Sequence, residues 1–223
     1  MNLKLILPVA AFYLLVSCNR NTGSHGSAEL SGEKSFSESS QLELEPIEYM
    51  SWIQDTEHGL KKEKVIDDIT FSAQYKPLAY IACMEERKNA IQESVLKEKE
   101  EELKGMQYYD LKISLSGEQT ELLKYKLQSG QEYQDRVNYF AFKMQKDISL
   151  VEGSDTVPCA LYHFERAYDV APYAKFLLGF PLTNKKDRKE KTLVFHDEIF
   201  KKGIIKLSFS PQQLINVPKL KTI

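Results

Sequence analysis

Residue types that carry catalysis are scarce in this chain. It has four histidines and three cysteines in 223 residues. No phosphate-binding glycine loop, no dinucleotide-binding glycine pattern and no serine-nucleophile elbow occurs in it. Enzymatic activity therefore has no support from sequence motifs, and we expect no catalytic residues and no cofactor.

A surplus of positive charge is also lacking. Thirty Lys and Arg face 32 Asp and Glu, a net charge of −2. Nucleic-acid binding proteins usually present a basic face, so we expect no nucleic-acid partner. No internal repeat is visible, and the length suits one domain with a sizeable core. The twelve Tyr and eleven Phe favour β structure.

One long apolar run lies at the N-terminus. A single positive charge, Lys4, precedes apolar residues 5–16, and Leu15-Val16-Ser17-Cys18 closes the run. The run is too short to cross a bilayer as a helix but has the length of a signal-peptide core. Residues 1–18 are therefore interpreted as a targeting segment, either an ordinary cleaved signal peptide or one with an acceptor cysteine.

The closing residues resemble the lipobox of bacterial lipoproteins, with Leu15 at −3, Ser17 at −1 and Cys18 at +1. The resemblance covers residues 1–18 alone. In that family the cysteine receives a diacylglyceryl group, the peptide is cut before it, and the new amino group is usually acylated. The resemblance implies lipidation of Cys18 and a membrane partner held through several acyl chains, since one chain binds only marginally.

Residues 19–45 are predicted to form a flexible tether. Seven of these 27 residues are Ser, three are Gly and five are Glu, so they cannot bury enough apolar surface to fold. No acidic cluster follows Cys18 directly, unlike the surface-export signal of Bacteroidota-like lipoproteins. This favours the periplasmic face of the outer membrane. Residues 46–223 are predicted to be the globular domain.

Period-two alternation dominates residues 46–223 and predicts a mostly β fold with short connections. Phe140, Phe142 and Met144 share one face of a predicted strand, so Phe142 is expected in the core and Lys143 in solvent. The expected architecture is an antiparallel β-sandwich, with a curled sheet packed on helices as the alternative. The predicted strands cover residues 69–75, 109–115, 137–151, 156–168, 173–180, 193–200 and 204–209.

Two helices are predicted in addition. The first runs from Pro77 to about Lys104, with one narrow apolar face and Gly105 placed to end it. Its charged residues are interpreted as a solvated face. The second lies within residues 117–128, where three leucines are spaced as on a short helix.

Cys83 and Cys159 both lie in apolar surroundings. An even number of cysteines in an oxidising compartment allows a disulfide, and two buried free thiols are the alternative. His163 follows Cys159 by four residues, which on a strand separates the two by about 13 Å. Direct proton transfer between them is excluded at that distance.

A metal site is conceivable if two late strands pair. His163 and Glu165 share a face of one strand, and His196, Asp197 and Glu198 lie on another. Histidine and carboxylate ligands suit zinc, but their spacing matches no known metal motif. Polar residues on a solvated sheet face explain the pattern equally well, and no metal is assigned.

The densest basic segment is interpreted as a solvated hairpin tip, with contact to lipid phosphates or an acidic partner as the alternative. Its basic residues are Lys185, Lys186, Arg188, Lys189 and Lys191.

These features favour a lipid-anchored envelope protein that acts by binding a protein partner, as an accessory or scaffold component of an envelope or secretion assembly. The alternative is a periplasmic ligand-binding or hydrolytic lipoprotein with a pocket in its sheet. A deep cavity with convergent polar groups would favour the alternative, and a filled domain would favour the scaffold.

Overall fold

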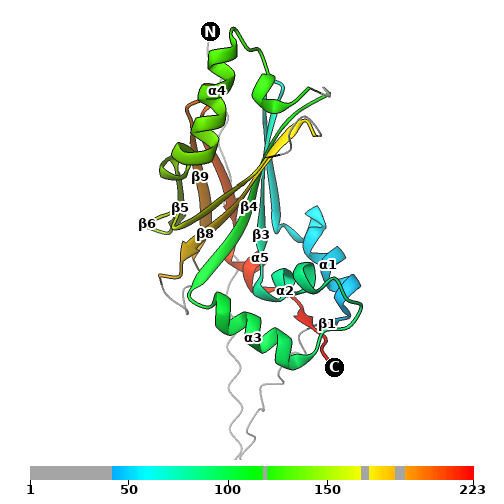
Figure 1. Cartoon of the computed structure of the whole chain (residues 1–223). Coiled ribbons are helices and arrows are strands. Elements are labelled where there is room, and N and C mark those ends of the chain that lie inside the picture. The colour runs from blue at the N-terminus through cyan, green and yellow to red at the C-terminus, as the bar shows by residue number, and fades with distance from the viewer. Residues whose placement is uncertain (1–41, 118–119, 167–170, 184–188) are drawn as a thin grey trace, which may run out of the picture. The chain divides into compact units, whose positions relative to one another are not determined.

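The computed structural model describes residues 42–117, 120–166, 171–183 and 189–223 (Figure 1). Every described element belongs to one compact unit, Ser40–Ile223. The signal segment, Cys18 and most of the predicted tether lie outside the described residues. The first element is β1 (Glu43–Leu44), which precedes the predicted start of the domain at Pro46.

The larger of the two main sheets has five antiparallel strands in the order β2-β3-β4-β8-β7. Their bounds are β2 Lys61–Ile66, β3 Ile69–Lys76, β4 Met106–Leu115, β8 Tyr173–Pro181 and β7 Leu161–Glu165. The predicted strands at 69–75, 109–115 and 173–180 are confirmed as β3, β4 and β8. Each alternates in burial as the sequence pattern requires, because one face of the sheet packs into the core.

The smaller sheet has four antiparallel strands in the order β10-β9-β5-β6. Their bounds are β10 Gly203–Phe209, β9 Lys191–Asp197, β5 Ile148–Glu152 and β6 Asp155–Pro158. A separate parallel pair joins β1 to β11 (Lys219–Leu220), near the C-terminus.

The inward faces of the two main sheets share one hydrophobic core. Aromatic rings meet across it: Phe71 lies 6.3 Å from Phe195, and Tyr109 lies 5.4 Å from Phe209, measured between ring centroids. Such tilted aromatic pairs add to the stabilisation that comes from burying their area. The chain is thus an α+β domain with antiparallel sheets.

The described part of the chain contains five α-helices, not the two predicted. Their bounds are α1 Pro46–Gln54, α2 Leu78–Glu86, α3 Glu93–Leu103, α4 Gly130–Asn138 and α5 Pro211–Ile215. Short 3₁₀ or π segments add η1 Thr56–His58, η2 Leu122–Lys124, η3 Tyr139–Lys143 and η4 Met144–Asp147. In Figure 1, α1, α2 and α3 lie at one end of the sheets and α4 at the other.

The helix predicted over 77–104 is broken into α2 and α3. Arg87 ends α2 in the left-handed conformation, at φ 53°, and the next helix starts only at Glu93. A non-glycine residue there interrupts the helical hydrogen bonding. The solvated face is confirmed for α3, which contains no buried residue.

A second hydrophobic cluster forms where α1 and α2 pack. It contains Tyr49, Ile53, Tyr80 and Cys83 among other buried residues, and it also includes Leu220 of β11. The C-terminal strand therefore completes this cluster. No helix in the described ranges is long and apolar enough to cross a membrane.

The strand predicted over 137–151 is wrong in its first two thirds. Residues 139–147 are helical, continuing from α4 through η3 and η4, and β5 begins only at Ile148. Phe140 and Met144 are fully buried, one helical turn apart, whereas Phe142 is 80 % exposed. Lys143 is exposed as predicted.

Two other predicted elements differ in detail. The strand expected over 156–168 is divided into β6 and β7, which belong to different sheets. The helix expected within 117–128 is reduced to the single turn η2. The chain passes from one sheet to the other at residues 159–160. The run that was predicted as one strand therefore contributes a strand to each sheet.

Candidate functional site

The two strands that carry the histidine and carboxylate residues do not come together to form a metal site. His163 and Glu165 lie on β7 in the five-stranded sheet, whereas His196 and Asp197 lie on β9 in the other sheet. Both histidines are exposed. In the parts of the chain that are described, no group of three His, Cys, Asp or Glu side chains could hold a metal ion.

Asp197 has a structural role instead. Its carboxylate is buried and accepts hydrogen bonds from the backbone N–H groups of Ile199, Phe200 and Lys202, at 3.1, 3.0 and 2.9 Å. These bonds fix the connection from β9 to β10. Neighbouring Glu198 points to solvent and pairs with Lys201 at 3.1 Å.

Both cysteines of the domain are buried free thiols. Cys83 belongs to the cluster under α1 and α2, while Cys159 belongs to the core between the sheets, so the disulfide alternative is not formed here. Burial raises the pKa of each thiol to about 11. Neither is a thiolate at neutral pH, which removes the nucleophilic role considered for Cys159 with His163.

Part of the basic segment is described, namely Lys189 and Lys191, and the other three basic residues lie outside the described ranges. Lys189 lies 3.8 Å from Asp155 on the surface. Lys191 instead points inward and reaches the buried carboxylate of Glu152, at 3.0 Å. The interpretation as a solvated tip therefore fails for Lys191.

A buried polar network surrounds Glu152. Its carboxylate accepts hydrogen bonds from Gln107 Nε2 at 2.6 Å and from the Thr183 hydroxyl, and Lys191 Nζ also donates to Gln107 Oε1 at 2.6 Å. Desolvation raises the pKa of Glu152, but the bonds from Thr183, Gln107 and Lys191 outweigh it, so the pKa lies below the usual value. The network joins β4, β5 and β9 through buried hydrogen bonds and one ion pair, so we interpret it as structural.

The most exposed aromatic side chain of the described residues belongs to η3. The turn from Tyr139 to Lys143 is a π-helix, a rare geometry that is frequent at functional sites. Tyr139 and Phe140 hold it to the core, and the Tyr162 hydroxyl donates to the Phe140 carbonyl at 2.5 Å. Phe142 projects from the outside of this anchored turn.

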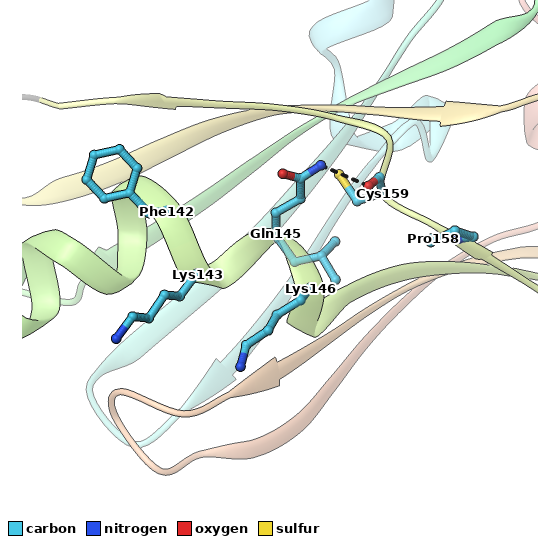
Figure 2. Close-up of a pocket in the computed structure, with 7 residues that line it drawn as sticks. Phe142, Lys143, Gln145, Lys146, Pro158 and Cys159 are labelled. Carbon is cyan, nitrogen blue, oxygen red and sulfur yellow. Dashed lines mark hydrogen bonds between the residues drawn. The ribbon is translucent and has the colours of Figure 1, made fainter.

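Phe142 borders an open hollow of about 530 Å³ (Figure 2). Its floor includes Cys159, whose carbonyl accepts a hydrogen bond of 3.0 Å from Gln145 Nε2. Lys143 and Lys146 extend in the same direction in Figure 2. The hollow is lined by Phe142, Lys143, Gln145, Lys146, Ile148, Pro158 and Cys159.

Charge at this hollow is positive and unmatched. Its two lysines are exposed, and neither enters an ion pair with any residue that the structure describes. No carboxylate lines the hollow. We name Phe142, Lys143 and Lys146 the Phe142 surface. An exposed ring beside two free cations can bind an acidic surface that offers an apolar side chain.

Sequence reasoning missed the Phe142 surface because it placed Phe142 in the core. A helical signal was nevertheless present: Tyr133, Val137, Phe140 and Met144 are spaced by four, three and four residues, and all four pack on or in the core. That spacing leaves Phe142 on the opposite side of the helix.

The chain matches no protein-family model, and no curated protein or solved structure is significantly similar to it.

Proposed function

We propose that the protein is a lipid-anchored envelope protein that acts by binding a partner protein, as an accessory or scaffold component of an envelope or secretion assembly. The observation that carries the binding role is Phe142, which is 80 % exposed on a turn whose neighbouring aromatics are buried. Large exposed aromatics are costly to leave in water and are enriched in protein interfaces. We also propose that Cys18 carries the lipid anchor and that the protein lies at the periplasmic face of the outer membrane. The description of the domain as a β-sandwich is part of the same proposal.

The chemistry of the Phe142 surface defines the partner. Two unpaired lysines favour an acidic surface, and the ring of Phe142 requires an apolar recess or side chain opposite it. The domain interior supports binding at the surface over binding inside the sheet, because residues from both sheets fill the core. A domain whose core is filled by its own side chains is what we expect of a scaffold, which binds partners at its surface.

Site-specific photocrosslinking tests the surface. A photoreactive phenylalanine analogue at position 142 of the full chain, expressed in the native envelope, is expected to capture one protein. The matched control is position 65, since Val65 is also apolar and 61 % exposed but lies on β2. Capture at neither position, or the same proteins at both, would contradict the proposal.

Once the partner is captured, Phe142→Ala is expected to weaken its affinity by about 30-fold, which is the loss of roughly 2 kcal/mol at an aromatic anchor. Lys143→Glu should slow association and make it less dependent on salt, because it removes favourable long-range charge. Surface plasmon resonance measures both effects. Unchanged affinity in Phe142→Ala would mean that the partner binds elsewhere.

The anchor has its own test. Cys18→Ser removes the thiol that would carry the diacylglyceryl group, so the protein is expected to move from the membrane fraction to the soluble fraction after cell breakage. Metabolic labelling with palmitate should fail in the same variant. A Cys18→Ser protein that stays in the membrane and still incorporates label would refute lipidation at this residue.

A further inference from the structure

A second hollow lies where the outer face of the five-stranded sheet meets α2 and α3. It has a volume of about 460 Å³ and shares no lining residue with the hollow at the Phe142 surface. Two of its apolar residues, Met84 and Leu161, remain 42 % and 38 % exposed. Its apolar residues are Ile81, Met84, Leu103, Tyr108, Leu161 and Leu177.

Gly179 lies in the sheet between two lining residues of this hollow. It pairs with Tyr108 on one side and with Leu161 on the other. A Cβ atom at this position would lie 2.9 Å from Leu161 Cβ and 3.1 Å from Met106 Cε. A side chain at residue 179 would therefore occupy the space between its neighbours.

The charged residues at the rim leave one positive charge unmatched. Glu85, the only carboxylate of the lining, pairs with Lys99 at 2.7 Å. Lys76 pairs with Asp110 at 3.3 Å. Arg87 is exposed, and no ion pair involves it within the described ranges.

We propose that this hollow binds a free fatty carboxylate, with its apolar chain against Tyr108, Leu161 and Leu177 and its carboxylate at Arg87. The volume lies within the usual range of small-molecule sites, about 300–1,000 Å³. The planar fork of arginine matches a carboxylate with two parallel hydrogen bonds. The proposal is independent of the Phe142 surface and holds even if that surface has no partner.

Calorimetric titration tests the ligand class. The fragment Ser40–Ile223 is suitable because it contains every described element and both hydrophobic clusters. Dodecanoate is expected to bind at one site. Acetate, which has the head group without the chain, should give no heat, and dodecyl maltoside, which has the chain without the charge, should bind about tenfold more weakly.

Variants locate the site. Arg87→Glu is expected to weaken dodecanoate binding at least tenfold, whereas Lys88→Glu, one residue away and outside the lining, should leave it unchanged. Leu161→Asp should abolish binding, and Met84→Asp serves the same purpose if Leu161→Asp does not fold. Thermal unfolding checks that each variant is intact.

Four results would overturn the proposal. Three are no dodecanoate binding to the unmodified fragment, equal binding by Arg87→Glu, and binding that survives an aspartate in the apolar wall. The fourth is equal affinity for dodecanoate and dodecyl maltoside, which would refute the carboxylate contact.

Discussion

Replacing Glu152 with Leu is expected to lower the free energy of unfolding by about 3–5 kcal/mol. The Glu152 side chain is 3 % exposed and that of its partner Lys191 is 15 % exposed, so removing the carboxylate leaves a buried ammonium group without its counter-charge. The donors of Gln107 and Thr183 lose an acceptor at the same time. Chemical denaturation of the fragment Ser40–Ile223 measures the change.

The matched control is Glu198→Leu. Glu198 also pairs with a lysine, Lys201, but both side chains are more than half exposed, so the pair should contribute less than about 1 kcal/mol. The double variant Glu152→Leu/Lys191→Met should recover part of the loss, because it removes both charges. Equal losses in Glu152→Leu and Glu198→Leu would show that the network around Glu152 does not stabilise the fold.

The same network predicts a pH dependence. The pKa of Glu152 in the folded domain is below its ordinary value of 4.5, so the ionised form is favoured by folding. Its contribution is fully present above pH 4.5 and is lost as the pH falls through the lower folded pKa. The difference in stability between the wild type and Glu152→Leu should therefore shrink in acid.

Truncating Phe140 to Ala is expected to destabilise the domain by about 3–5 kcal/mol. Phe140 is fully buried, and its ring lies 5.2 Å from that of Phe176 and 5.6 Å from that of Phe164. The truncation leaves a cavity between the π-helix and the five-stranded sheet.

Phe142→Ala is the control for Phe140→Ala and should change stability by less than about 0.5 kcal/mol, since its ring is exposed. The sequence pattern made the opposite prediction for Phe142. A comparable loss in both variants would mean that residues 139–143 are extended, as that pattern predicted, and would remove the basis for the Phe142 surface.

How far the sequence predicts this fold depends on what its patterns can distinguish. The strands that contain Phe71 and Leu111 were predicted well, because each has one buried and one solvated face, and alternation reports this directly. Residues 137–147 fit both a period of two and a helical period. Only packing against Phe164 and Phe176 decides between them.

The candidate site was harder to predict. Whether His163 and His196 meet depends on which strands pair, and pairing between distant strands leaves no local signal. The sequence also does not predict that the side chain of Lys191 points inward, because the charged residues around it make the whole segment resemble a loop. Exposure of an aromatic on a helix can be predicted only after the buried side of that helix is known.

The pairing of β1 with β11 has a consequence for the order in which the chain can fold. Leu44 lies opposite Leu220, and the backbone of Ile223 bonds to Ile91 and Glu93. A ribosome makes β1 long before β11, so β1 has no strand partner until β11 has been synthesised. Folding at this end must wait for β11, and a nascent chain that has not reached Lys219 leaves Leu44 unpaired and the hydrophobic cluster of α1 and α2 without Leu220.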